Sequence, residues 1–263
     1  MLPRLLGWLS VIKTALRSTF LIIFGIKKAP PVFIPLRLLN NYTLNGRIKL
    51  RYLYFDDSAA SNKPAVYTTQ QIDACISRVA RKEVFYYGQT DSWLYQALEK
   101  YNIKGQEVAI IGSVCPVYES ICLYYGGRPT TIEYNKIISQ DSRLRILDAG
   151  CMNNVVSFGA AFSVSSFEHD GLGRYGDKLN PEGDLEAIKK TKEILKPGGI
   201  LFLAVPVGMD TIVWNAHRIY GRVRLPMLLE DWDILETFGF SEELLGCPDS
   251  DIQPIFVLKN TRG

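Results

Sequence analysis

The stretch EVAIIGSVCPVYESICLYYGGRPTTIEY, residues 107–134, decides the fold that this sequence predicts. Residues 107–111 are a short apolar run, which is typical of a strand buried on both faces of a parallel sheet. The chain then turns at Gly112, and a helix is predicted over 117–125 because a glycine pair follows it. A second strand over 129–134 completes a βαβ unit.

An acidic residue lies at the end of the second predicted strand. Glu133 is 21 residues beyond Gly112, and adenosyl- and dinucleotide-binding folds place a ribose-binding carboxylate at about this spacing. Two adjacent hydroxyl donors need an acceptor with two oxygens, which a carboxylate provides. We therefore expect Gly112 and Glu133 to converge on one adenosyl-sized crevice.

The rest of the chain continues the alternation of strands and helices. Strands are predicted over 158–164 and 200–206, and a helix begins after Asn180-Pro181, which supply a cap and a first-turn proline. This pattern predicts an α/β fold with a doubly wound, mostly parallel, Rossmann-like sheet. An N-terminal apolar helix precedes it.

Residues 145–151 (RILDAGC) imitate a first-strand motif. Only 18 residues separate Gly150 from Glu168, too few for a helix, two strands and their connections, whereas 56 separate Gly112 from Glu168. We therefore interpret 144–149 as the third strand. Asp148 at its end either contacts adenine or lies in a solvated turn.

Composition divides the chain into four parts. These are an apolar helix over 1–28, an irregular linker over 29–65 with a short extended piece at 48–53, a helical extension over 66–104, and the α/β domain over 105–263. Residues 1–55 carry nine Lys or Arg and no acid, whereas the remainder carries a net charge of −6. A basic, apolar arm before an acidic globule favours a membrane surface over nucleic acid as partner.

The arm is too interrupted to span a bilayer cleanly. Lys13 and Arg17 divide the apolar run over residues 5–26, and a spanning helix needs roughly 20 apolar residues. At helical spacing the two cations share one face, as in an interfacial helix with snorkelling side chains. The alternatives are a signal-anchor, a cleaved signal peptide or an ordinary docking helix.

Three later motifs resemble class I S-adenosylmethionine-dependent methyltransferases: VSSFEH (164–169), LKPGGILFLAVP (195–206) and LETFGF (235–240). In that superfamily an EH follows the fourth strand, LKPGG precedes the fifth, and GF follows a late helix. More narrowly, the segments SSFEHDGLGRYGD, VPVG and WNAHRIYG resemble a methyltransferase-like family first catalogued in nematodes (Caenorhabditis) as a domain of unknown function. The resemblance covers about residues 105–259.

The resemblance implies S-adenosylmethionine as cofactor, with Gly112 and Ser113 at its methionine end, Glu133 at its ribose, and the segment after Val164 facing the substrate. The candidate cofactor-binding residues are Gly112, Ser113, Pro116, Glu119, Glu133, Tyr134, Ser165 and Ser166. Methyltransferases commonly show three glycines after the first strand, whereas the turn here has one, which leaves less backbone room for a ligand.

His169 and His217 are the two histidines of the chain. Both lie in polar clusters where the ligand-binding edge of the sheet is expected, and a base there would take the proton of an oxygen acceptor. With Asp170 they are the catalytic candidates; the alternative for His169 is a hydrogen-bonded structural histidine. A metal site built from Glu168, His169, Asp170 and Asp177 matches no established ligand spacing.

Two polar segments are candidates for the substrate. One is the glycine-rich loop 170–177, and the other is the arginine-bearing segment 214–224, which could grip a phosphate or carboxylate. The substrate candidates are Arg174, Tyr175, Asp177, Arg218 and Tyr220. The alternatives are an Arg174–Asp177 staple and a surface helix whose arginines pair with Glu230, Asp231 and Asp233.

These features predict a methyltransferase for a small-molecule or glycan-like acceptor, held at a membrane by residues 1–28. The alternative is a catalytically inactive protein that kept the fold as a binding or scaffold module at the membrane. NAD-dependent redox chemistry would share the Glu133 argument, but the turn after the first predicted strand, which begins at Gly112, lacks the GxGxxG fingerprint.

Deleting residues 1–28 is expected to release the protein from lipid vesicles, because the interfacial helix is the predicted anchor. Co-sedimentation of the full and shortened chains with vesicles measures this. Equal sedimentation of the two chains would contradict the prediction.

Overall fold

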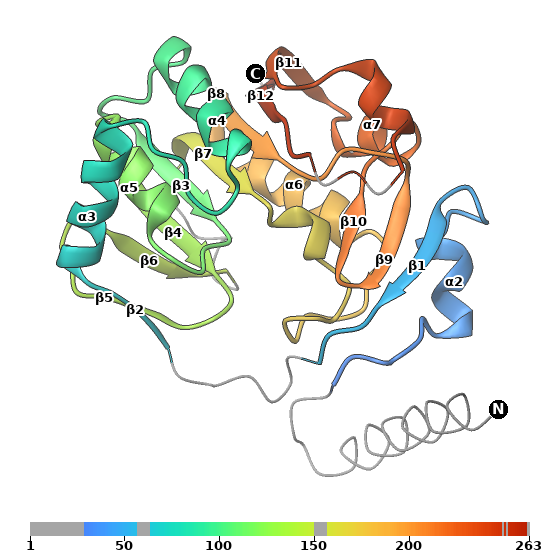
Figure 1. Ribbon diagram of the computed structural model, residues 1–263. Coiled ribbons are helices and arrows are strands. Elements are labelled where there is room, and N and C mark those ends of the chain that lie inside the picture. Colours follow the sequence, from blue (N-terminus) through green and yellow to red (C-terminus); the bar gives the residue numbers. More distant parts are fainter. Residues whose placement is uncertain (1–28, 57–63, 150–156, 249, 251, 262–263) are drawn as a thin grey trace.

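A mostly parallel sheet forms the centre of the computed structural model, which describes residues 29–56, 64–149, 157–248, 250 and 252–261 (Figure 1). Among these residues the sheet has seven strands in the order β11-β12-β8-β7-β3-β4-β6. The strands are β3 (Glu107–Ile111), β4 (Arg128–Glu133), β6 (Arg145–Asp148), β7 (Phe158–Val164), β8 (Leu195–Ala204), β11 (Trp232–Phe238) and β12 (Ile255–Asn260). The arm over 1–28 lies outside the described residues.

Strand direction confirms the predicted doubly wound arrangement. β6, β4, β3, β7 and β8 run parallel, whereas β12 is antiparallel to both β8 and β11. β6 pairs with β4, so residues 145–148 form the third strand and not a first-strand motif. The LETF segment lies in β11 and not in a late helix, which corrects the expectation drawn from the superfamily pattern.

Helices cover both faces of the sheet (Figure 1). One face carries α3 (Thr69–Ala80), α4 (Gln89–Lys100) and α5 (Val117–Tyr124), and the other carries α6 (Gly183–Ile194) and α7 (Arg224–Leu228). Along β8, Phe202 and Ala204 pack into the hydrophobic core beneath α3, α4 and α5. Leu201 and Leu203 point to the opposite face and pack into the core beneath α6 and α7. This alternation buries a continuous apolar strand on both sides. No helix in the described part of the chain has the length and apolarity to cross a membrane.

A second sheet stands beside the central one. Within the described residues it comprises β1 (Lys49–Leu53), β9 (Thr211–Asn215) and β10 (His217–Ile219), with β1 parallel to β9. The helix α2 (Leu36–Tyr42) packs on it through a core that includes Tyr42 and Trp214. The prediction of an irregular linker over 29–65 is therefore wrong for α2, whereas the extended piece predicted at 48–53 matches β1.

Short elements complete the fold. β2 (Ala65–Tyr67) pairs with β5 (Ile137–Ser139), and two single-turn helices are η2 (Phe167–His169) and η3 (Glu242–Gly246). The β2 strand brings Tyr67 beneath the turn that follows β3, where its hydroxyl lies 2.9 Å from Ser113 Oγ. The η2 turn follows β7 and carries Glu168 and His169 toward the second sheet.

A buried ion cluster joins α6, β10 and α7. Asp184 has no exposed surface, and its carboxylate accepts hydrogen bonds from Arg224 Nη2 (2.5 Å), Arg224 Nε (3.1 Å) and the Tyr220 hydroxyl (3.0 Å). Arg218 Nε lies 3.6 Å from the same carboxylate. Arg218 and Arg224 hold the pKa of Asp184 below its usual value despite burial, so the group stays ionised.

Asp184→Asn is expected to lower the free energy of unfolding by about 3–5 kcal/mol, because it leaves buried guanidinium groups without their counter-charge. Denaturant unfolding monitored by circular dichroism measures the change. Glu186→Gln, on an exposed position of the same helix, is the matched control and should differ from the parent by less than about 0.5 kcal/mol. A small effect of Asp184→Asn would contradict this account of the cluster.

Candidate functional site

The turn after β3 and the acid at the end of β4 converge, as the spacing predicts. The Ser113 backbone N–H donates to Glu133 Oε2 at 3.1 Å. The other oxygen, Oε1, accepts from the Asn135 backbone N–H (3.0 Å) and from Asn135 Nδ2 (3.2 Å). Three of the roughly four acceptor positions of the carboxylate are therefore used by the chain itself.

The turn at Gly112 is packed against the segment after β7. Gly112 has φ +71°, and a Cβ there would lie 2.8 Å from Ser166 Cβ. Glycine is thus required both by the left-handed backbone and by the close approach of Ser166. The Ser113 side chain is buried and committed to Tyr67 and to the Cys115 carbonyl.

The remaining cofactor candidates beside this turn differ in accessibility. Tyr134 is 66% exposed at the end of β4. Partial burial, followed by the charges of Asp170, Asp177, Glu133 and Asp148, raises its pKa. Pro116 and Glu119 are buried, and Glu119 accepts the hydroxyl of Thr131 at 2.7 Å. Glu119 therefore supports α5 from within and does not face a ligand.

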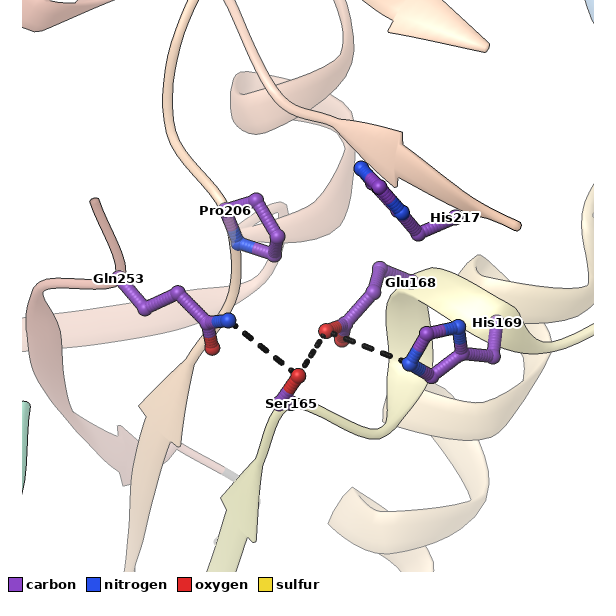
Figure 2. A pocket seen from close by; sticks show the side chains of 6 residues that line it. All are labelled: Ser165, Glu168, His169, Pro206, His217 and Gln253. Atoms are coloured by element: carbon purple, nitrogen blue, oxygen red, sulfur yellow. Dashed lines mark hydrogen bonds and ion pairs between the residues drawn. The ribbon is translucent and has the colours of Figure 1, made fainter. Parts of the chain in front are cut away.

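A pocket of about 110 Å³ lies at the carboxyl ends of β7 and β8 (Figure 2). Figure 2 shows polar side chains from three regions of the chain around it. The lining residues are Ser165, Glu168, His169, Pro206, His217 and Gln253. Parallel α/β sheets bind ligands at this edge.

Ser165 lines the pocket and lies in the short connection between β7 and η2. It follows β7 with φ +52°, a left-handed conformation that costs a non-glycine residue about 1–2 kcal/mol. Its hydroxyl donates to Glu168 Oε1 at 2.6 Å and accepts from Gln253 Nε2 at 3.2 Å. Strained serines between a strand and a helical turn are concentrated at functional sites.

The two histidines meet at the pocket. Their ring centroids are 6.4 Å apart, and His169 Nδ1 lies 2.6 Å from the Ala216 carbonyl oxygen. A carbonyl oxygen only accepts, so Nδ1 of the neutral ring carries the proton and Nε2 is left as an acceptor. Burial lowers the pKa of His169 and of His217 to about 4. His169 is therefore a weaker base at neutral pH than the sequence predicts.

The pKa values of two carboxyl groups in the same segment are raised instead of lowered. Burial raises the pKa of Glu168 to about 7, and burial together with the charge of Asp177 raises that of Asp170 to about 8. Glu168 is 1% exposed, and its Oε2 has no hydrogen-bond partner among the described residues. A carboxyl group with a pKa near neutrality suits proton transfer.

The substrate candidates from the loop 170–177 lie beside the pocket. The Tyr175 ring is half-exposed and packs edge-on against His169 at 5.6 Å. The Arg174 guanidinium stacks over Phe55 and Tyr175. Asp177 Oδ2 accepts the backbone N–H groups of Gly171 and Gly173, so the carboxylate fixes the shape of its own loop.

Arg218 and Tyr220 do not line the pocket. Arg218 is 1% exposed, and Nη1 donates to the Asp170 carbonyl at 2.6 Å. Tyr220 is fully buried and bonded to Asp184. The prediction that these two residues contact substrate is therefore wrong, because both belong to the buried ion cluster. Arg218 lies in β10 and Tyr220 directly after it, so the alternative prediction of a surface helix is wrong as well.

Sequence reasoning missed Glu168 as a proton acceptor and Gln253 altogether. The EH motif at 168–169 marks this position, but the sequence analysis assigns the role of base to His169 and not to Glu168. Gln253 lies in the connection to β12, where no local pattern marks it. In the described part of the chain, no three His, Cys, Asp or Glu side chains are placed to hold a metal ion.

The strand order, with β12 antiparallel inside an otherwise parallel sheet, defines the class I methyltransferase-like α/β fold. A family model described as "Caenorhabditis protein of unknown function, DUF268" matches residues 105–246. The chain belongs to this family, as its SSFEH and WNAHRIYG segments predict. No curated protein matches it significantly in sequence.

Solved structures of similar architecture have low sequence identity. The 1,6-didemethyltoxoflavin-N1-methyltransferase of Burkholderia thailandensis is 12% identical, with a TM-score of 0.47 over 64% of this chain and 76% of that one. The N-methyltransferase NodS of Bradyrhizobium japonicum is 14% identical, with a TM-score of 0.46 over 66% and 95%. The [4+2]-cyclase SpnF is 14% identical, with a TM-score of 0.47 over 76% and 100%. At this level of similarity, these structures do not indicate the activity of the present chain.

Both imidazole rings are expected to stay neutral from pH 8 down to pH 5, because burial holds their pKa values near 4. Nitrogen-15 NMR of the ring signals measures this, and His169 should show the Nδ1–H tautomer. Titration midpoints near the ordinary value of about 6.5 would contradict the described environment.

Proposed function

We propose that this protein is an S-adenosylmethionine-dependent methyltransferase acting on a small-molecule or glycan-like acceptor. The observation that supports it most is the contact between the Ser113 backbone and Glu133, which holds the turn after β3 against the acid at the end of β4. Ser165 lines the pocket at the ends of β7 and β8, and its neighbour Ser166 packs against the Gly112 turn. Cofactor and acceptor sites would then share one edge of the sheet.

The residues at this crevice fit the adenosyl half of the cofactor. Oε2 of Glu133 keeps one acceptor position, and the bond from Asn135 Nδ2 to Oε1 lies on the exposed side. One ribose hydroxyl can donate to the free position of Oε2. The other can displace the Asn135 amide from Oε1 at little cost, because the amide then hydrogen-bonds to water. Tyr134 offers an exposed ring for the base, with Asp148 paired beside Glu133 at the end of β6.

When bound, S-adenosylmethionine supplies a methyl group activated by a cationic sulfur. The chain's own contribution is electrostatic and positional. The charges of Asp177, Glu133 and Asp148 act on Tyr134 and help to raise its pKa, and carboxylates in this region favour a cationic ligand. Ser165 and Glu168 stand on the acceptor side, where a proton is taken up as the new bond forms.

The alternative is a catalytically inactive binding or scaffold protein of the same fold. The observation that favours it is the packing of Ser166 on Gly112 and of Tyr67 on Ser113, which occupies the turn with the chain's own side chains. In either case, attachment to a membrane surface through residues 1–28 is a proposal that rests on the sequence of that segment.

Isothermal titration calorimetry with S-adenosylmethionine and with S-adenosylhomocysteine is expected to give saturable heat. Glu133→Ala should weaken binding at least about 100-fold, because two hydrogen bonds to a charged group are lost. Asn135→Ala is the matched control: it removes the exposed amide, keeps the carboxylate and should bind at least as well as the parent. Absence of heat at millimolar ligand would favour the inactive scaffold.

A further inference from the structure

The pocket of Figure 2 places the side-chain acceptors of Ser165, Glu168 and His169 close to one another. His169 Nε2 is left with a lone pair, because Nδ1 bonds to the Ala216 carbonyl. It lies 3.7 Å from Glu168 Oε1. A carboxylate facing a nitrogen lone pair is unfavourable unless a proton or an N–H group of a ligand joins them.

Neither Ser165 nor Gln253 relieves this surplus of acceptors. The single hydroxyl proton of Ser165 goes to Glu168 Oε1, so Ser165 must accept from the Gln253 amide. Glu168 Oε2 and Gln253 Oε1 are buried acceptors without a hydrogen-bond partner among the residues the structure describes. Pro206, on the opposite wall, has no N–H to donate. A ligand with several N–H donors would satisfy these acceptors.

The number of missing donors distinguishes between classes of ligand. A hydroxyl group brings one donor, whereas an ammonium group brings three and also a positive charge. Glu168 is the counter-charge within the pocket, and unpaired buried carboxylates are costly. The nearby cations are engaged elsewhere: Arg218 lies against Asp184, and Arg174 stacks over Phe55 and Tyr175.

We propose that this pocket binds the amine group of the acceptor, with its N–H groups directed at Glu168 and His169, and that Glu168 takes the proton released before methyl transfer. The assignment deepens the proposed methyltransferase function and rests on it for the transfer step. It narrows the acceptor to a primary or secondary amine, including an amino sugar.

The chemical step balances with groups already named. The ammonium gives one proton to the Glu168 carboxylate, which becomes a carboxylic acid. The freed nitrogen lone pair attacks the methyl carbon of the donor; an N–C bond forms, the C–S bond breaks, and its electron pair stays on sulfur. Glu168 then returns the proton to solvent. Burial brings the pKa of Glu168 to about 7, so both of its forms are accessible near neutral pH.

The two histidines make the proposal directly measurable, because both line this pocket and the chain has no others. Their imidazole NMR signals therefore report on it alone. At pH 7.5, propylammonium chloride should shift both sets of signals saturably. 1-Propanol, which has one donor, and tetramethylammonium, which has charge without donors, should shift them at least about tenfold more weakly.

Glu168→Gln should raise the dissociation constant of propylammonium at least about tenfold, because it removes the negative charge and replaces one acceptor oxygen by an NH2 donor. Glu186→Gln, at an exposed position on α6, should leave it unchanged. Equal shifts with 1-propanol, or full binding of propylammonium to Glu168→Gln, would overturn the proposal. The comparison of the three probes on the parent protein decides the question even if Glu168→Gln does not fold.

The outcomes separate this proposal from the methyltransferase proposal. Calorimetric binding of S-adenosylmethionine without selective binding of propylammonium overturns the amine assignment and leaves the methyltransferase proposal standing. Selective binding of propylammonium without binding of S-adenosylmethionine supports the amine site and removes the transfer step.

Discussion

One buried carboxylate holds the second half of this molecule in place. Asp184 receives two guanidinium groups in a region with almost no exposed surface. One negative charge does not neutralise two positive ones, so carbonyl oxygens must complete the cluster. Arg218 bonds to the carbonyls of Glu168, Asp170 and Asn180, and both arginines bond to that of Pro181. The Arg218 guanidinium thus fixes the backbone of the segment between η2 and α6.

The chemistry of the pocket follows from that constraint. Because the backbone of Glu168 and Asp170 is bound to Arg218, the Glu168 side chain is held beneath Ser165, away from water. Burial then shifts carboxyl groups toward protonation and histidines toward neutrality, which brings groups of opposite type to a common uncharged state near neutral pH. Because the pKa of Glu168 lies near neutrality, its ionised form is still accessible as the counter-charge for a cationic ligand.

The sequence predicted the central sheet well, because its strands are continuous apolar runs and its acid and glycine lie at an informative spacing. Gly112 and Glu133 needed only local pattern to be placed together. Arg218 was misinterpreted, since arginines interleaved with aromatic residues look like a surface segment until Asp184, far away in the chain, is brought beside them. Gln253 and the pairing of β1 with β9 depend on tertiary contacts that leave no local periodicity.

The pairing of β1 with β9 also constrains the order in which the chain acquires its structure. The Phe55 backbone N–H and carbonyl both bond to the Asn215 side chain, 160 positions later. The β1 region therefore has no partner until about 160 further residues have been synthesised, and contacts so distant along the chain form slowly. Until β9 is available, the unpaired edge of β1 must remain soluble.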